Sequence, residues 1–345
     1  MIRKALIAGC GALGNEVIKN LALMGVSDFC IVDFDEVEKS NLTRSILFTP
    51  DDIGRPKVEV ARQAILRINP DAHVRAIKGN ICHDVGLGTI RKADIIFSCL
   101  DSRWSRYCLQ RLCLRAGKVM IDGGILNLEG TVRTFMPRHS CYACSLGEEA
   151  LEELRKRMPC SGIIRRQEQA GHAPTTPIIA SVIGAMMVQE GTRTPPWPKG
   201  ASYDGETLTM RRIALHAWDE DCPLHDAWEP IETLPEISPE SRVGDLRTTI
   251  GEGRLFLNEP YVAHIEHVPT GQRIQVGLPA HEVETFISTH PTLRRYPLSQ
   301  FTQSEECIIS LDGELRHLTL RELGIPPEEV LRVETPHSIR YIEIG

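Results

Sequence analysis

The 345-residue sequence has no excess of basic residues: 39 Lys and Arg stand against 46 Asp and Glu, for a net charge of −7. This balance argues against a general nucleic-acid or membrane-surface binder, because phosphate binding requires clustered positive charge. The sequence also lacks an apolar run approaching the roughly 18 residues of a membrane-spanning helix, its best run extending from Pro177 to Val188. The apolar fraction of 42% and the charged fraction of 25% are ordinary for a globular protein.

The N-terminus lacks the pattern of a signal peptide. The short apolar stretch that follows Lys4 breaks at Gly9-Cys10-Gly11, which is typical of a strand followed by a turn. We therefore expect a cytoplasmic protein, in which thiols stay reduced. Its eleven cysteines are then core residues, metal ligands or nucleophiles rather than a disulfide framework.

The first 135 residues alternate near-continuous apolar runs with helical patterns. The predicted strands are Lys4–Ala8, Asp28–Asp33, His73–Lys78, Ile95–Cys99, Val119–Gly123 and Thr131–Phe135. The predicted helices are Ala12–Met24, Pro56–Ile68, Arg103–Arg115 and, further on, Thr176–Glu190. This alternation predicts an α/β fold with a Rossmann-like, mostly parallel sheet and helices on both faces.

The length suggests about two domains. We expect a first domain over residues 1–226 that includes an irregular crossover loop at about 136–176, a linker over 227–244 and a small C-terminal α+β domain over 245–345. In the last domain the predicted strands are Tyr261–Val268, Arg273–Val276, Cys307–Leu311 and Arg340–Ile344, and the predicted helical pieces are Pro279–Thr289 and Thr319–Leu323.

A glycine-rich turn follows the first predicted strand. Residues 9–14 read Gly-Cys-Gly-Ala-Leu-Gly, a G-x-G-x-x-G pattern that opens a helix. Such glycines allow a tight turn and a close approach of backbone to phosphate, and the helix N-terminus adds partial positive charge. Asp33 ends the next strand, where a carboxylate can accept hydrogen bonds from ribose hydroxyls. The pattern predicts nucleotide binding but does not choose between NAD and ATP; the alternative is a glycine turn that only packs helix on strand.

The charged residues downstream favour ATP over a dinucleotide. Arg44 and Lys57 can neutralise charge on an α-phosphate and a departing pyrophosphate, and Asn41 lies close to Arg44 in sequence. Asp101 follows a buried strand, and its carboxylate suits Mg²⁺, which prefers one or two carboxylates plus phosphate oxygens. Taken singly, each charged residue of this kind is more often a solvated surface residue. The order and spacing of all of them together favour a role in binding ATP.

With these motifs in order, residues 3–226 strongly resemble the ubiquitin-activating-enzyme superfamily, which includes bacterial adenylyltransferases for sulfur-carrier proteins. The resemblance implies a nucleotide site made of Gly9, Gly11, Gly14, Asp33, Asp35, Asn41, Arg44, Lys57 and Asp101. In that site the glycines line the phosphates and Asp33 holds the adenosine ribose. Asn41, Arg44 and Lys57 contact the phosphates. Asp101 holds Mg²⁺, and Arg44, Lys57 and Asp101 are the groups that assist the chemistry.

The implied reaction is adenylation of the C-terminal glycine carboxylate of a ubiquitin-like or sulfur-carrier protein, with release of pyrophosphate from ATP. Most members of the superfamily dimerise, so a homodimer is expected. The segment Thr319–Pro326 resembles a helix–turn of β-grasp folds. By analogy, the C-terminal domain recruits a ubiquitin-conjugating-like enzyme or the carrier; the alternative is a dimerising or stabilising appendage.

One feature departs from the sulfur-carrier type of the superfamily. Those members place a helix before the first strand, and an arginine of this helix reaches into the ATP site of the partner subunit. The present sequence starts at the first strand. Another arginine then substitutes, or a partner protein supplies one, or activity is low.

Two short cysteine pairs predict a zinc site. Cys141 and Cys144 form C-x-x-C, and Cys222 with His225 forms C-x-x-H. Two chelating pairs match a closed tetrahedral zinc site. The resemblance implies two C-x-x-C pairs at these places, so that His225 replaces the last cysteine. The alternatives for the first pair are a redox pair and buried free thiols.

Cys160 is the candidate nucleophile. It lies in the crossover loop, where the ubiquitin-activating group carries its thioester cysteine. Five basic neighbours would lower the pKa of its thiol: Arg155, Lys156, Arg157, Arg165 and Arg166. In the single-domain activators, however, the position of that cysteine corresponds to Gln169 of this sequence. The alternative is an ordinary loop thiol in an enzyme that stops at the adenylate.

Three further functions stay open. The chain could be a sulfur-carrier adenylyltransferase of the thiamine or molybdopterin type that has no thioester step. It could also be a non-catalytic member of the superfamily that binds an active partner, although Arg44, Lys57 and Asp101 argue against this. A dehydrogenase is disfavoured, because it needs neither the Asn-x-x-Arg motif nor a zinc site.

Overall fold

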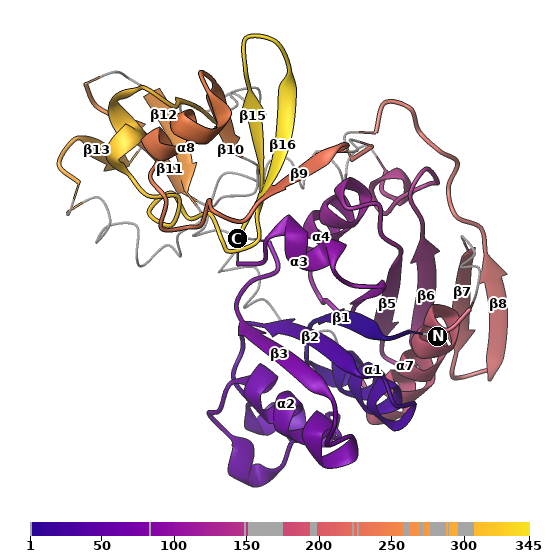
Figure 1. Cartoon of the computed structure of the whole chain (residues 1–345). Coiled ribbons are helices and arrows are strands. Elements are labelled where there is room, and N and C mark those ends of the chain that lie inside the picture. The colour runs from indigo at the N-terminus through magenta and orange to yellow at the C-terminus, as the bar shows by residue number, and fades with distance from the viewer. Residues whose placement is uncertain are drawn as a thin grey trace. The chain divides into compact units, whose positions relative to one another are not determined.

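The computed structural model describes residues 2–82, 84–147, 150, 175–193, 199–222, 224–225, 228–257, 263–269, 272–276, 288, 290–295 and 307–345. The chain divides into two compact units (Figure 1). Unit 1 comprises the described parts of 1–81, 90–147 and 171–227. Unit 2 comprises those of 82–89, 148–170 and 228–345.

An eight-stranded sheet forms the centre of unit 1, in the order β3-β2-β1-β4-β5-β6-β7-β8. Its strands are β1 (Lys4–Ala8), β2 (Asp28–Asp33), β3 (His73–Lys78), β4 (Ile95–Ser98), β5 (Met120–Leu126), β6 (Glu129–Phe135), β7 (Lys199–Asp204) and β8 (Thr209–Ile213). The five strands from β3 to β5 pair in parallel, and β6 to β8 are antiparallel additions. The order 3-2-1-4-5 is that of a Rossmann-like sheet, which confirms the predicted fold class.

Helices cover both faces of this sheet. The α-helices of the first half are α1 (Ala12–Leu23), α2 (Lys57–Ile68), α3 (Leu87–Arg91) and α4 (Arg103–Arg115), and α7 (Pro177–Gly191) comes later. Short 3-10 turns are η1 (Lys39–Thr43), η2 (Pro50–Asp52) and η3 (Ala143–Ser145). Side chains of α1, α2 and α7 share one apolar cluster with alternate residues of the strands, such as Ile7 and Phe97. Helix α4 contributes nothing to that cluster but contacts β4 and β5, so it lies on the other face.

The burial of β1 explains why its sequence is apolar throughout. Ala5, Leu6, Ile7 and Ala8 have no exposed surface. A central parallel strand that is covered on both faces has no polar side, which produces a continuous apolar run instead of an alternating one. The same signature made the central strands predictable from sequence.

Unit 2 is a mixed α+β structure. Its main sheet has the order β14-β10-β15-β16-β9, and a second sheet has the order β12-β11-β13. The elements are β9 (Ile231–Leu234), α8 (Val243–Ile250), β10 (Arg254–Leu257), β11 (Ala263–His267), β12 (Gln272–Val276), β13 (Leu293–Arg295), β14 (Cys307–Ser310), η5 (Glu314–His317), β15 (Val330–Glu334) and β16 (Ile339–Ile344). A separate apolar cluster fills this unit. The α+β class is confirmed, and the β-grasp assignment stays a prediction.

Two sequence interpretations of this region are corrected. Residues 227–244, expected to be a linker, contain β9, which pairs in parallel with the last strand through Ile231 and Tyr341. The predicted helical piece Thr319–Leu323 is instead a series of hydrogen-bonded turns. In them the Thr319 hydroxyl donates to the Glu322 carboxylate and accepts from the backbone N–H of Glu322. The predicted helix Pro279–Thr289 falls almost wholly outside the described residues.

Unit 2 includes a short segment from the connection between β3 and β4. The backbone N–H of Leu87 donates to Glu329 Oε1 at 3.2 Å, and the N–H of Gly88 donates to the carbonyl of Glu328 at 2.7 Å. A Cβ on Gly88 would lie 2.7 Å from that same carbonyl oxygen. Only glycine therefore permits the close approach of these two backbones.

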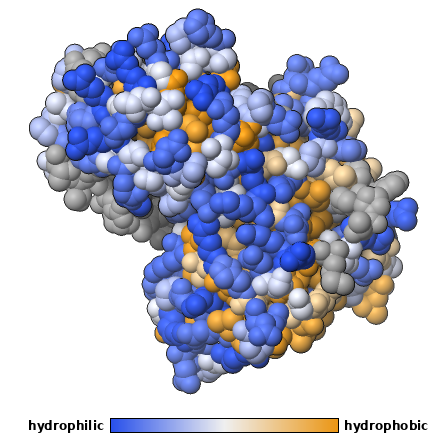
Figure 2. Space-filling view, viewed as in Figure 1, coloured by the Kyte–Doolittle hydropathy of each residue, from blue (hydrophilic) through white to orange (hydrophobic). Residues whose placement is uncertain are grey.

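No helix in the described part of the chain is long and apolar enough to cross a membrane. On the face shown in Figure 2, hydrophilic residues predominate in both units and hydrophobic residues form separate patches among them.

Candidate functional site

The three glycines of the turn after β1 have different surroundings. Gly9 has a φ of +94°, and a Cβ there would lie 2.5 Å from the carbonyl oxygen of Cys99. A Cβ on Gly14 would overlap the carbonyl oxygen of Gly9, whereas a Cβ on Gly11 would meet nothing within 4 Å. The first and third glycines are thus required by the turn and by helix packing, and Gly11 leaves an open face at which a phosphate can approach the backbone.

Asn15 fixes the shape of this turn and was not singled out from the sequence. Its buried side-chain amide donates to the carbonyls of Cys10 at 2.7 Å and Gly11 at 3.0 Å. Its oxygen accepts from the backbone N–H of Leu47 at 2.8 Å, three residues after Arg44. One side chain thus joins the glycine turn to the segment that follows Arg44.

Asp33, at the carboxyl end of β2, lies against the glycine turn. Its carboxylate accepts hydrogen bonds from the backbone N–H of Cys10 at 2.6 Å and of Asp35 at 2.8 Å. Burial raises the pKa of Asp33, while the Lys57 ammonium acts in the opposite direction. Each carboxylate oxygen keeps a second lone pair, so a ribose hydroxyl can still donate to it.

Lys57 is the first residue of α2 and is only 6% exposed. Its ammonium forms an ion pair with Asp35 Oδ2 at 2.7 Å. Burial by itself would lower the pKa of Lys57, but the carboxylates of Asp33 and Asp35 outweigh it and the pKa rises. The side chain is therefore a fixed cation beside the glycine turn, and the structure brings the turn, both aspartates and Lys57 together.

Asn41 and Arg44 belong to the η1 turn and its end. The side-chain oxygen of Asn41 accepts from the backbone N–H of Glu38 at 2.9 Å, so Asn41 closes its own turn. Arg44 is partly exposed and donates to the carbonyl of Ser40 at 2.9 Å. Their contact with phosphates stays a prediction.

Asp101 is an exposed residue just beyond β4, in a turn that a buried arginine fixes. The Arg106 guanidinium donates to both oxygens of Asp122, at 2.8 and 2.7 Å, and to the carbonyl of Leu100. Burial would lower the pKa of Arg106, but Asp122 outweighs it and the pKa rises. The sequence signal for this turn was Arg106 itself, five residues after Asp101.

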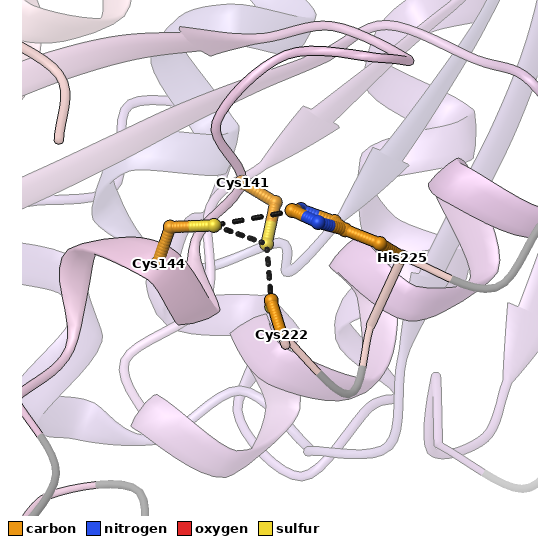
Figure 3. A group of neighbouring side chains, drawn as sticks. All are labelled: Cys141, Cys144, Cys222 and His225. Carbon is orange, nitrogen blue, oxygen red and sulfur yellow. Dashed lines mark hydrogen bonds between the residues drawn. The ribbon is translucent and has the colours of Figure 1, made fainter. Parts of the chain in front are cut away.

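The four predicted metal ligands lie together within unit 1 (Figure 3). Cys141 Sγ lies 3.6 Å from the sulfur atoms of both Cys144 and Cys222, and Cys144 Sγ lies 3.4 Å from His225 Nε2. A hydrogen bond from the Cys141 thiol lowers the pKa of Cys222 to about 6, which favours the thiolate that binds metals.

These distances fit one tetrahedral zinc ion. Zn–S bonds of about 2.3 Å and Zn–N bonds of about 2.0 Å predict tetrahedral edges of about 3.8 Å between sulfurs and about 3.5 Å between sulfur and nitrogen. Three of the six edges are 3.4–3.6 Å long and so close to these values, and all four ligand atoms lie within 4.8 Å of one another. Three sulfurs and one imidazole nitrogen are also a donor set that zinc prefers.

Cys160 lies outside the described residues, so its role as a nucleophile stays a prediction. Among the described cysteines away from the metal cluster, burial raises the pKa of Cys10, Cys99 and Cys113. Their thiols are therefore poor nucleophiles.

Comparisons with known proteins show relatives of this chain. A model of the ThiF family matches residues 3–224. The SAMP-activating enzyme E1 of Haloferax volcanii is 33% identical over 149 residues, which cover 42% of this chain and about half of that protein, 54%. The molybdopterin-synthase adenylyltransferase of Escherichia coli is 30% identical over 219 residues, covering 61% of this chain and 83% of that protein.

Another relative is the E. coli sulfur carrier protein ThiS adenylyltransferase, which is 26% identical over 225 residues, 64% of this chain and 85% of that protein. Among solved structures, E. coli MccB with ATP superposes with a TM-score of 0.52 over 65% of this chain and 67% of that chain, at 23% identity. This last likeness shows the fold alone. The family match, which spans well over half of the sequence, confirms the resemblance to the ubiquitin-activating-enzyme superfamily: the chain belongs to the ThiF family.

Proposed function

We propose that this chain is an adenylyltransferase that uses ATP to activate the C-terminal carboxylate of a ubiquitin-like or sulfur-carrier protein. The observation that carries the proposal is the open backbone face at Gly11 beside a carboxylate, Asp33, and a buried cation, Lys57. This arrangement suits a nucleotide that presents ribose and phosphates together. The names of the E. coli and H. volcanii relatives supply the class of substrate.

In this reaction a carboxylate oxygen of the terminal glycine attacks the α-phosphorus of ATP. A new C(O)–O–P bond forms, the bond between the α-phosphorus and the bridging oxygen breaks, and pyrophosphate leaves with that electron pair. The product is an acyl adenylate. It reacts with nucleophiles far more readily than a carboxylate does, because AMP is a much better leaving group than oxide.

The residues of the site divide this work. The turn that contains Gly11 presents backbone N–H groups to the phosphates, and Asp33 accepts from the ribose. Lys57 and Arg44 neutralise the charge that develops on the transferred phosphate and on pyrophosphate, and one such preorganised group contributes about 3–4 kcal/mol to the transition state. Asp101 supplies an exposed carboxylate of the kind that holds Mg²⁺ on a phosphate.

Zinc in the cluster of Cys141, Cys144, Cys222 and His225 has a structural role in this proposal. The two pairs come from chain segments 81 residues apart. A closed tetrahedral site leaves no open position for a substrate and contributes to folding energy. The metal would thus hold the start of the crossover loop against the segment that follows β8.

A thioester step on Cys160 extends the proposal. The Cys160 thiolate would attack the acyl adenylate, form a C–S bond and release AMP, after which a ubiquitin-conjugating-like enzyme bound by unit 2 would accept the acyl group. The alternative is that the adenylate passes directly to a sulfurtransferase. The two E. coli relatives are named adenylyltransferases. The homodimer and the cytoplasmic location also remain expectations.

Exchange of radioactive pyrophosphate into ATP tests the adenylation step. The substrate is a purified β-grasp protein that ends in glycine, and the same protein without its last residue serves as the substrate control. We expect Lys57→Met to lower exchange by about 100-fold or more, in line with a loss of 3–4 kcal/mol. Lys4→Met is the matched variant. Lys4 forms its ion pair with Asp28 at the amino ends of β1 and β2, whereas the glycine turn lies at the carboxyl end of β1. Equal exchange in both variants contradicts the proposal.

Cys160→Ala separates the two fates of the adenylate. The variant should retain pyrophosphate exchange but lose a carrier adduct that reductant cleaves. Retention of that adduct excludes Cys160 as the nucleophile, and absence of an adduct in the unaltered protein favours transfer without a thioester.

A further inference from the structure

The imidazole of His225 is held in an unusual way for a metal ligand. A ligating histidine generally donates its second ring N–H to a carboxylate or carbonyl, and this bond fixes the ring. His225 Nε2 faces the sulfur of Cys144, whereas the buried Nδ1 has no hydrogen-bond partner within the part of the chain that the structure describes. No hydrogen bond from a described residue therefore orients this ring at Nδ1.

An indole ring lies flat against it. The ring centroids of Trp218 and His225 are 3.5 Å apart, and their planes differ by 13°. Trp218 itself is 43% exposed. One face of the imidazole is therefore covered by an aromatic ring, so the stack shields the ligand from water on this side.

The local chain path brings these two rings together. After β8 the backbone runs without regular structure to residue 219, where it reverses. The N–H of Cys222 donates to the carbonyl of Asp219 at 3.2 Å, and the N–H of His225 donates to the carbonyl of Cys222 at 3.1 Å. These consecutive turns fold residue 225 back over residue 218, so the stack is built into the same loop that supplies two of the four ligands.

We infer that Trp218 is a positioning residue for the metal cluster: it sets the orientation of the His225 ring and limits the access of water to it. The rotation of an imidazole about its side-chain bonds is the first step by which this ligand would leave a metal. Stacking opposes that rotation, as a hydrogen bond to the second ring nitrogen does in other sites. A thiolate at position 225 would need no such support, because it has no ring to orient.

Release of zinc from the loaded full-length protein to a chromophoric chelator tests this inference. Trp218→Leu keeps an apolar side chain but removes the ring, and we expect release to accelerate by about 10- to 100-fold, the usual cost of a lost supporting contact. Trp218→Phe keeps a stacking ring and should stay close to the unaltered protein. Met210→Ala removes a more exposed apolar side chain, on β8, and should change nothing.

A double-mutant comparison distinguishes positioning from general loop stability. In a His225→Cys background, Trp218→Leu should leave the release rate unchanged, because the ring on which Trp218 acts is absent. The Co²⁺-loaded forms give a second readout: the visible ligand-field band should weaken in Trp218→Leu but not in Trp218→Phe.

Three results would overturn the inference. These are equal acceleration by Trp218→Leu in both backgrounds, Phe and Leu variants that release zinc at the same rate, and failure of the unaltered protein to bind Zn²⁺ or Co²⁺.

Discussion

Replacing Gly11 with alanine separates nucleotide binding from folding at the glycine turn. Gly11 has a φ of −72°, which alanine adopts without strain, and a Cβ there meets no atom within 4 Å. Alanine reduces the freedom of the unfolded chain, worth about 0.4–1 kcal/mol of stability. It is also a poorer helix N-cap, at a cost of similar size. The two effects nearly cancel, so we expect an unchanged melting temperature.

The effect on ATP should be large by comparison. The added methyl group occupies the open face where a phosphate oxygen would accept a backbone N–H. Loss of one hydrogen bond to a charged group costs about 1.5–3 kcal/mol, which weakens ATP binding by about 10- to 100-fold. Titration calorimetry with ATP measures this change, and a thermal melt of the same sample measures stability.

Gly14→Ala is the matched variant. Its Cβ would overlap the carbonyl oxygen of Gly9, and overpacking of this kind costs about 1–3 kcal/mol. At about 2–4 °C per kcal/mol for a domain of this size, its melting temperature should fall by several degrees. The reasoning fails if Gly11→Ala binds ATP as tightly as the unaltered protein, or if it melts as low as Gly14→Ala.

Three other variants test the charges and the metal cluster. Asp52 accepts two hydrogen bonds from Thr49; burial would raise its pKa, but these bonds outweigh it and the pKa is lowered. A carboxylate with a lowered pKa stabilises the fold above its unfolded pKa of about 3.9. Asp52→Asn should therefore cost about 1–2 kcal/mol in a urea titration at pH 7, and the difference should shrink as the pH falls below about 4; a constant difference would contradict the assignment. Cys222→Ser should lower zinc content from about one per chain and destabilise unit 1, as measured by metal analysis and thermal melting, and metal-free protein with an unchanged melt would refute the zinc site. Arg106→Met leaves the Asp122 carboxylate buried at 1% exposure and without its guanidinium, so unfolding free energy should fall by about 3–5 kcal/mol, with partial recovery in the double variant that adds Asp122→Asn.

The parallel core of unit 1 could be read from the sequence because its strands carry their signal locally. Each central strand is buried on both faces, and the intervening helices have their own apolar spacing. Strand β9 carries no such signal: its four residues are all at least partly exposed. It becomes a strand only by pairing with β16, more than a hundred residues away, and no local pattern records that partner.

In the candidate site, too, some residues have a local sequence signal and others do not. The grouping of Cys141, Cys144, Cys222 and His225 was predictable because each pair occupies one turn of chain and the chemistry of zinc limits which residues can bind it. Asp33 and Lys57 followed from their places at the ends of elements. The support from Asn15 and Trp218 depends on contacts across folded loops, and polar or aromatic residues in such positions look like any others in sequence.

The segment 82–89 means that the two units cannot be separated by a single cut in the chain. An expression product that stops before residue 228 would still carry this segment but would lose Glu328 and Glu329, which hold its backbone. Leu87, now 1% exposed, would face solvent only a few residues before β4. Aggregation of such a shortened protein would then result from the loss of the contacts with Glu328 and Glu329. Its inactivity would reveal nothing about the chemistry of the ATP site. Two co-expressed fragments, or an internal replacement of 82–89, are the informative designs for studying either unit alone.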